Sequence, residues 1–245
     1  MVKTARLIVL TSCVLIARPH ASPRLAAADD ILARSRAVYA ALKTYSDTGA
    51  VDHEFGTTSR ISNEHHTFKT YYRAPRSFFF DFTKVGNTDR FVVWSDEEAF
   101  HTWWRTSGAA ETYPKGQGTS AFVTGAARSA GSILVISPWL FSQSGLTGAL
   151  TEFGDATVAG TETINGKPCH KLTGTAKSVY AASGHVSNVR AMTVWIDVDT
   201  LLVRRVLEDG TPPGETVVSR TTTSFEPQAN PTLDDAVFKF TPPVR

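Results

Sequence analysis

Apolar and polar residues alternate along much of the chain, and this period of two predicts β-strands with one buried face. The clearest example is Val189–Leu207, where apolar residues recur at every second position on both sides of Asp197–Thr200. With a hairpin tip at Val198-Asp199, Val194 is expected opposite Val203 on one continuous apolar face. The alternation does not exclude a slip of register by one residue.

The same pattern in Ser77–Arg105 predicts three consecutive strands joined by turns at Gly86-Asn87 and Asp96-Glu97. The second turn is expected to place Val93 opposite Phe100. Seven large apolar side chains then share one face of these strands: Phe78, Phe80, Phe82, Phe91, Val93, Phe100 and Trp104.

This aromatic face has two interpretations. Aromatic side chains bury much area and ordinarily fill the core of a β-domain, but they also line cavities for apolar ligands. The candidate ligand-binding residues are therefore the seven side chains of this face together with Val194, Ile196, Val203 and Trp139.

Two segments depart from the β pattern. Asp29 to about Tyr45 has an apolar stripe at helical spacing and predicts an N-terminal helix. Between Pro114 and Glu152 glycines interrupt an apolar stretch, with Ser137-Pro138 as a helix-start signal. Apolar side chains between permissive glycines predict that Gly131–Gly145 forms a lid over the sheet, although a fixed connecting segment fits the same pattern.

The other strands complete a mainly β (α+β) fold. About ten or eleven strands are expected in one large curved antiparallel sheet or incomplete barrel, with an N-terminal helix and a helical lid. The further strands are expected at 48–55, 59–72, 156–163, 167–175, 215–225 and 237–240.

Residues 1–28 have the features of a secretory signal peptide: two basic residues, an apolar run at Leu7–Ala17 and small residues before Asp29. The 11-residue run is shorter than the roughly 20 residues that cross a bilayer. Leu10–Cys13 resembles a bacterial lipobox, but the apolar run continues past Cys13. The expected mature chain is a single domain, 29–245, in the periplasm and not integral to the membrane.

Removing this segment changes the charge of the protein. All four charged residues in 1–28 are basic, so the formal net charge changes from +2 to −2. The mature chain has no clusters of basic residues, which gives no basis for nucleic-acid binding. Cys169 is then the only cysteine, so no intramolecular disulfide is expected.

Motifs for catalysis are missing from the sequence. It contains no nucleophile elbow, no zinc-binding His-Glu-x-x-His and no phosphate-binding glycine loop. His53, His65 and His66 are expected too far apart along one hairpin to share a metal ion. Cys169 lies in a predicted strand and is expected to be a small buried apolar group. We expect neither an enzyme nor a bound metal or cofactor.

Four segments together resemble the LolA/LolB-like superfamily of envelope proteins, and most closely a family of predicted periplasmic proteins of unknown function within it. They are the helix end Leu42–Ser46 followed by Gly49, the segment Asn165–Leu172, the hairpin from Val194–Asp197 to Arg204-Arg205, and the tail Ala236–Pro243.

The resemblance implies a strongly curved, incomplete barrel that is closed by a helical lid and, in some members, holds the acyl chains of lipoproteins. The expected function is therefore non-catalytic binding of a hydrophobic ligand, such as a lipid or a lipoprotein acyl chain, in the periplasm. The resemblance also permits an alternative, an interaction or sensory module that recognises a partner protein in the envelope.

Overall fold

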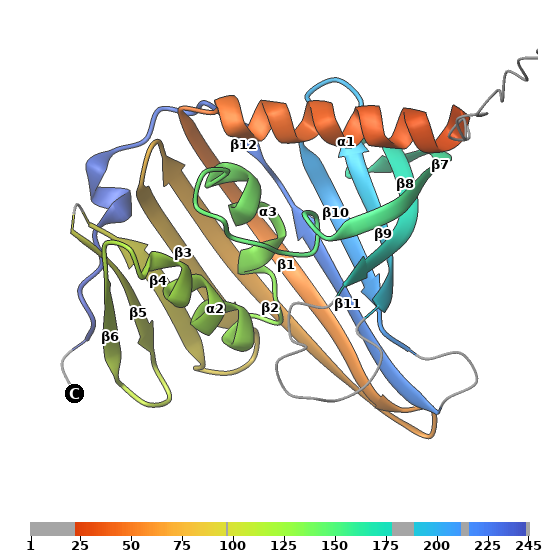
Figure 1. Cartoon of the computed structure of the whole chain (residues 1–245). Coiled ribbons are helices and arrows are strands. Elements are labelled where there is room, and N and C mark those ends of the chain that lie inside the picture. The colour runs from red at the N-terminus through yellow and green to blue at the C-terminus, as the bar shows by residue number, and fades with distance from the viewer. Residues whose placement is uncertain (1–22, 97, 178–188, 212–215, 244–245) are drawn as a thin grey trace, which may run out of the picture.

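A computed structural model describes residues 23–96, 98–177, 189–211 and 216–243. Figure 1 shows one large sheet, with two short helices inside its concave face and a longer helix lying across one end of the strands. The period-two alternation of the sequence explains this layering, because it gives each strand one apolar face to bury.

The strands of the described chain follow in sequence order, with the helices α2 (Gly118–Arg128) and α3 (Ile133–Leu140) inserted between β6 and β7. They are β1 (Thr44–Thr57), β2 (Arg60–Arg73), β3 (Ser77–Lys84), β4 (Arg90–Ser95), β5 (Ala99–Trp104), β6 (Ala110–Pro114), β7 (Phe153–Ile164), β8 (Lys167–Lys177), β9 (Val189–Asp197), β10 (Val203–Asp209), β11 (Val217–Phe225) and β12 (Gln228–Ala229).

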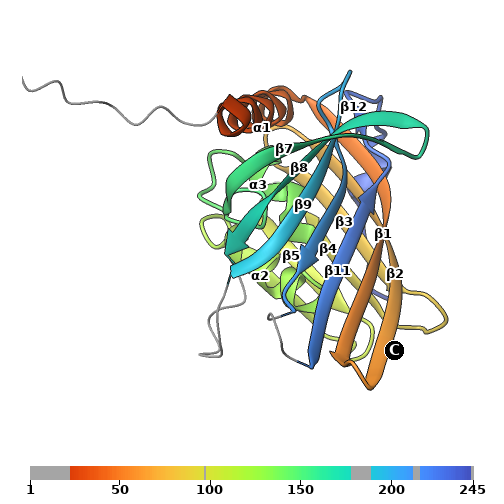
Figure 2. The same ribbon diagram turned by 90° about the vertical axis from the view of Figure 1, so that its right-hand side faces the viewer.

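These strands form a single antiparallel sheet in the order β6-β5-β4-β3-β2-β1-β11-β10-β9-β8-β7, and β12 pairs with the start of β1. β6 and β7 do not pair with each other in the described chain, so the sheet curves without closing (Figure 2). The predicted fold class, a mainly β protein with a large curved antiparallel sheet or incomplete barrel, is confirmed. The described strands number twelve rather than the ten or eleven expected.

Helix α1 (Pro23–Ala41) lies across the end of the sheet and packs against β7 and α3. The predicted apolar stripe is its buried face, on which Ser35 and Tyr39 are fully buried. Ser35 Oγ donates a hydrogen bond to the Leu201 carbonyl at 2.7 Å, and Tyr39 Oη accepts one from the Val203 amide at 3.1 Å. These bonds fix the helix to the connection between β9 and β10.

The hairpin of β9 and β10 differs in register from the prediction. Val203 lies opposite Ile196 instead of Val194, and the register shifts between Val203 and Arg205. Asp197 causes the longer turn, because its Oδ1 accepts hydrogen bonds from the amides of Asp199 and Thr200, each at 3.0 Å. Side-chain capping of this kind is typical of Asp in turns.

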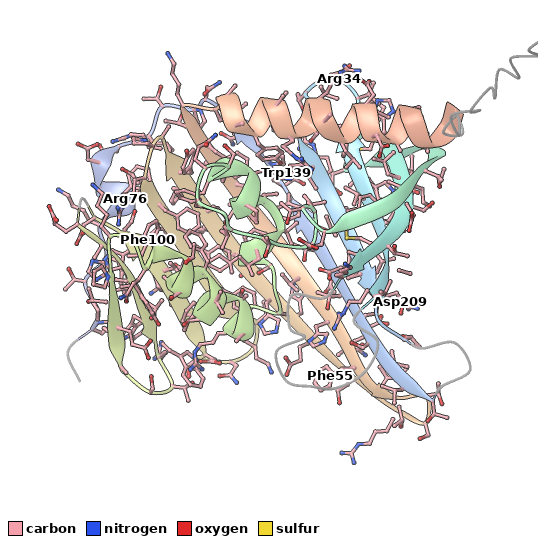
Figure 3. All side chains as sticks on the ribbon, in the orientation of Figure 1. Arg34, Phe55, Arg76, Phe100, Trp139 and Asp209 are labelled. Carbon is pink, nitrogen blue, oxygen red and sulfur yellow. The ribbon has the colours of Figure 1, made fainter. Side chains whose placement is uncertain are left out.

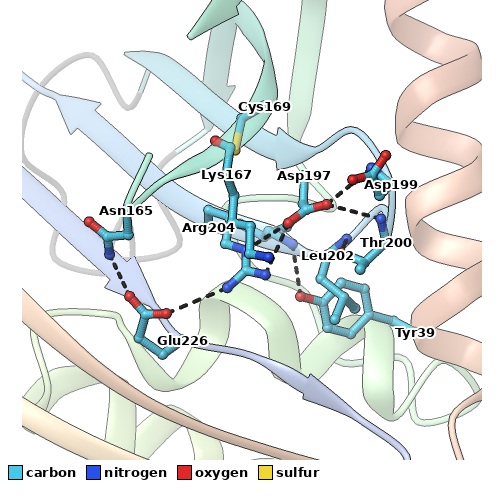
Figure 4. A network of polar contacts seen from close by, with 11 residues as sticks. Tyr39, Asn165, Lys167, Cys169, Asp197, Asp199, Thr200, Leu202, Arg204 and Glu226 are labelled. Carbon is cyan, nitrogen blue, oxygen red and sulfur yellow. Dashed lines mark hydrogen bonds and ion pairs between the residues drawn. The ribbon is translucent and has the colours of Figure 1, made fainter. Parts of the chain in front are cut away.

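Arg204, at the bulge, is 7% exposed and joins this turn to the neighbouring strand (Figure 4). Its Nη2 lies 3.0 Å from Asp197 Oδ2, and its Nη1 lies 3.5 Å from Glu226 Oε2. Burial alone would raise the pKa of Asp197, but hydrogen bonds from Thr200 and Arg204 hold that pKa below its usual value. Loss of either partner would leave a buried charge unpaired, which typically costs about 3–5 kcal/mol.

The pairing of β4 with β5 also differs from the prediction. Val93 lies opposite Thr102, and Phe100 lies opposite Ser95. The turn closes between Asp96 and Ala99, where Asp96 N donates to the Ala99 carbonyl at 3.1 Å. A shift by two residues keeps every side chain on its face, so Phe100 still points to the concave side.

The chain near the C-terminus is not the strand predicted at 237–240. Asp235–Phe238 is a 3₁₀ turn, and Phe238 packs on the convex face of the sheet in a small apolar cluster with Phe79 and Trp103. Phe240 lies against the same face, with its ring centroid 5.0 Å from that of Trp94. These contacts bury aromatic residues on the side of the sheet opposite the two short helices.

The predicted helical segment is present as α2 (Gly118–Arg128) and α3 (Ile133–Leu140), which lie within the concave face. The start signal at Ser137-Pro138 is wrong, because α3 begins at Ile133 and contains Pro138. Proline has no amide hydrogen, so Leu134 O lacks the usual helical bond from position 138. Gly148 packs against this carbonyl instead, and a Cβ atom at Gly148 would lie 1.9 Å from Leu134 O.

We expect Gly148→Ala to lower the free energy of unfolding by about 1–3 kcal/mol, because the new methyl group must displace the backbone of α3. Gly154→Ala is the matched control, because a Cβ at Gly154 meets no atom within 4 Å. Urea unfolding of the two variants measures the difference. Equal stabilities for both variants would show that the contact between Gly148 and Leu134 is not tight.

Candidate functional site

The candidate ligand-binding residues come from three distant parts of the sequence and meet in one apolar cluster on the concave face of the sheet. All of them except Trp104 are buried, with none more than 6% exposed. They are Phe78, Phe80, Phe82, Phe91, Val93, Phe100, Trp139, Val194, Ile196 and Val203. Trp104 packs at the edge of this cluster, with Arg128 over its ring at 3.7 Å.

Helix α3 covers this surface, and all eight of its residues are buried. Trp139, which Figure 3 shows just below α1, has its ring centroid 5.6 Å from that of Tyr39. At the end of the helix, Tyr72 Oη donates a hydrogen bond to the Leu140 carbonyl at 3.1 Å. Helix α3 itself therefore fills the space above the aromatic face, and ligand binding by that face stays a prediction.

The glycines at both ends of the predicted lid have positive φ angles. Gly131 has φ +80° and Gly145 has φ +71°, values that favour glycine. In the described part of the chain, Trp139 Nε1 is buried and has no hydrogen-bond partner.

Sequence reasoning missed several side chains that complete the surface. Phe68 and Tyr72 lie on the concave side of β2, and Phe122 on α2 and Phe141 after α3 pack against the aromatic face. The Phe141 ring lies 5.3 Å from Phe122 and 5.0 Å from Tyr72 between ring centroids. The alternation of β2 could have indicated Phe68 and Tyr72, and Phe141 is one of the apolar residues of the predicted lid, whereas Phe122 has no comparable signal.

A cleft of about 270 Å³ lies where the lid ends. Its apolar walls are Phe100, Phe122, Phe141 and Leu146, and Arg76 and the start of α2 complete it. Another cleft, of about 650 Å³, lies on the convex face and is lined mostly by threonines and charged residues. The smaller cleft is the one that suits an apolar group, because its aromatic walls belong to the apolar cluster.

A buried carboxyl group lies on the concave face of β1. Asp47 is 3% exposed and accepts a hydrogen bond from Tyr45 Oη at 2.5 Å. Burial raises the pKa of Asp47 to about 7, although the bond from Tyr45 acts in the opposite direction. Tyr45 in turn packs against Tyr39, with 5.7 Å between ring centroids, so this acid lies near the contact between α1 and α3.

In the folded protein Asp47 stays protonated up to about pH 7, whereas in the unfolded chain it loses its proton near the ordinary pKa of 3.8. The free energy of unfolding should therefore fall as the pH rises between these two values. Above about pH 7 the contribution of Asp47 to the free energy of unfolding no longer changes with pH. We expect Asp47→Asn to remove a pH-dependent difference on the order of 4 kcal/mol.

Urea unfolding of wild type and Asp47→Asn at several pH values tests this expectation. Asp52→Asn is the control, because its carboxyl group lies on the same strand with a side chain that is 60% exposed. If wild type and Asp47→Asn lose stability in parallel across the range, Asp47 is not the group that titrates.

The described residues contain no group of three or more His, Cys, Asp and Glu side chains placed to hold a metal ion. Cys169 is fully buried beside Ile164 and Trp195, as expected for a small apolar group, and burial raises its pKa. Among the helices that the structure describes, none has the length and apolar character needed to cross a bilayer.

The geometry defines a class: an open antiparallel sheet whose apolar concave face is covered by a helical segment. Residues 125–229, less than half of the chain, match the family model described as LppX_LprAFG lipoprotein. The resemblance to LolA-like envelope proteins that the sequence indicated is confirmed by this match. No curated protein matches the sequence.

Several solved structures are similar to the chain at low identity. Lipoprotein LppX from Mycobacterium tuberculosis is 17% identical, with 84% of this chain and 98% of that chain covered and a TM-score of 0.47. A chain of the MucA/MucB complex from Pseudomonas aeruginosa is 14% identical, with 88% of this chain and 63% of that chain covered and a TM-score of 0.45. A LolA superfamily protein from Nitrosomonas europaea is 7% identical, with 87% and 97% covered and a TM-score of 0.34.

Proposed function

We propose that this chain is an envelope protein that binds the alkyl chain of a lipid or an acylated protein between the lid and the concave face of the sheet, without catalysing a reaction. The lid is the predicted segment Gly131–Gly145, which contains α3. The observation that carries the proposal is the convergence of the eleven predicted residues in one apolar cluster, in which Trp139 belongs to this segment and the other ten to the rest of the chain.

The way in which that surface is covered supports a binding role. Strand β3 is held on both sides by backbone pairing with β2 and β4, whereas α3 is held mainly by apolar packing and by the bond from Tyr72 to Leu140. A helix held in this way can separate from the sheet without breaking any strand pairing. An alkyl chain can then lie between α3 and the aromatic face and make apolar contacts with both.

The family match supports the same proposal, because the matched model describes lipoproteins and residues 125–229 include α3 and strands β7 to β11. The predicted signal peptide supports an envelope location. Binding rather than catalysis is favoured because the surface beneath α3 is mainly apolar and aromatic.

Amide hydrogen exchange tests the proposal. In the ligand-free protein, amides in 131–145 should exchange faster than those in the β9–β10 hairpin, and palmitate should slow the lid while leaving the hairpin nearly unchanged. Acetate is the control, because it has the same headgroup without the alkyl chain.

If exchange in 131–145 is already as slow as in the hairpin and palmitate does not change it, the lid is a fixed part of the core. The proposal that the chain binds a lipid beneath the lid then fails. A module that recognises a partner protein in the envelope becomes the better interpretation.

The mature N-terminus is a separate prediction. We expect cleavage before Asp29, because small residues precede it in the sequence. Ala28 is fully buried within α1, so this cleavage would remove one residue from the core. Intact-mass spectrometry of protein recovered from the cell envelope should give a chain that begins at Asp29. A chain that begins at a lipidated Cys13 would contradict the prediction and identify a lipid-anchored protein.

A further inference from the structure

Arg76 lies in the turn between β2 and β3, at the place where two clefts meet. It lines the apolar cleft of about 270 Å³ at the end of the lid and also a groove of about 860 Å³ beneath the C-terminal segment. Figure 3 shows Arg76 next to Phe100, and its Cζ atom lies 5.3 Å from the centre of the Phe100 ring. The guanidinium group therefore lies at the rim of the cleft whose aromatic walls belong to the apolar cluster.

The positive charge of Arg76 has no counter-charge among the described residues. Its Nε atom is buried and has no hydrogen-bond partner there. Two carboxylates line the adjacent groove, but both bind other groups. Asp96 Oδ2 lies 2.7 Å from His101 Nε2, and Asp235 Oδ1 lies 2.5 Å from Arg73 Nη1. A partly buried guanidinium without a partner is costly, and an anion that pairs with it would remove that cost.

The backbone holds Arg76 in a defined position. Ser95 Oγ donates a hydrogen bond to the Arg76 carbonyl at 2.8 Å and accepts one from the Phe78 amide at 2.7 Å. Ser95 is itself 4% exposed. The base of the side chain is therefore fixed to β3 and β4, which keeps the guanidinium near the aromatic face.

The first turn of α2 provides a second favourable element for an anion. Gly118 and Thr119 line the same cleft, and the residue before the helix, Gln117, makes no side-chain capping bond. Amide hydrogens at the start of a helix favour a negative charge. A cation and a helix N-terminus thus lie on the same cleft as the aromatic rings.

We propose that Arg76 binds the anionic headgroup, a carboxylate or a phosphate, of a single-chain amphiphile whose alkyl chain enters between Phe100, Phe122 and Phe141 and continues beneath α3. This inference rests on the proposed function and specifies its ligand class. Arg76 and the start of α2 hold the headgroup at the rim, and the aromatic rings surround the first part of the chain. Paired charge-assisted bonds are the usual way in which arginine recognises such groups.

Binding measurements with three ligands of similar chain length test the proposal: palmitate, palmitoyl lysophosphatidate and neutral monopalmitin, at about pH 8. Wild type should bind an anionic ligand about tenfold more tightly than monopalmitin. Arg76→Gln should weaken anionic binding by about tenfold and change monopalmitin binding by less than about twofold. Arg76→Lys should recover part of the loss, because it keeps the charge but not the planar fork.

Arg73→Gln is the matched control, because it removes the same charge at a position three residues before Arg76. The Arg73 side chain lines the groove but not the apolar cleft. It should leave the affinities of all three ligands unchanged. Thermal unfolding of each variant checks that it is folded. A loss confined to palmitate identifies a carboxylate ligand, and a loss confined to lysophosphatidate identifies a phosphate ligand.

If wild type binds the anionic and neutral ligands equally well and Arg76→Gln changes neither, the role of Arg76 is overturned while lipid binding stands. The same conclusion holds if Arg73→Gln has the larger effect. If wild type binds none of the three ligands, the proposed function fails and this inference fails with it.

Discussion

The packing of α3 against the concave face of an open sheet is the contact on which the rest of this structure depends. A curved sheet that does not close leaves its apolar interior open on one side, and here that interior combines phenylalanines with aliphatic side chains. Each large apolar side chain that is fully buried contributes about 1.5–3 kcal/mol relative to exposure. The helical segment supplies this burial, so the segment that was predicted as a lid is also part of the hydrophobic core.

This arrangement divides the molecule into two parts that differ in how they are held. Around the β9–β10 hairpin, backbone pairing, the bond from Val203 to Tyr39 and the buried Arg204–Asp197 pair fix the geometry. Around α3 the described contacts are mainly apolar and aromatic and have little directional preference. A ligand of the same apolar character can enter between α3 and the sheet and contact both, whereas it cannot replace the polar network of the hairpin.

The sequence predicted which face of each strand is buried more reliably than which residues lie opposite each other. Alternation alone places Phe100 and Val203 on the concave face, and a shift of register by two does not change that. The registers depended on Asp96 and Asp197, whose side chains bind turn amides and lengthen the turns in ways that hydrophobic pattern does not reveal. The 3₁₀ turn at Asp235–Phe238 was missed for a related reason, because its apolar residues cover the convex face without strand pairing.

The sequence predicted the apolar part of the candidate site but not its charged residue. Apolar residues between glycines indicated the covering segment, and alternation indicated the aromatic face beneath it. Arg76 had no such signal, because a single arginine in a turn belongs to no periodic pattern and its position beside Phe100 exists only in three dimensions.

The most direct test of the central claim is a crystal structure of the protein with palmitate that carries bromine at the end of the alkyl chain. Bromine can be located by its anomalous scattering. The account predicts a bromine peak on the concave face of the sheet, between α3 and the rings of Phe78 and Phe80, with α3 displaced from its ligand-free position. A peak found only on the convex face or at the molecular surface, with α3 unmoved, would contradict it.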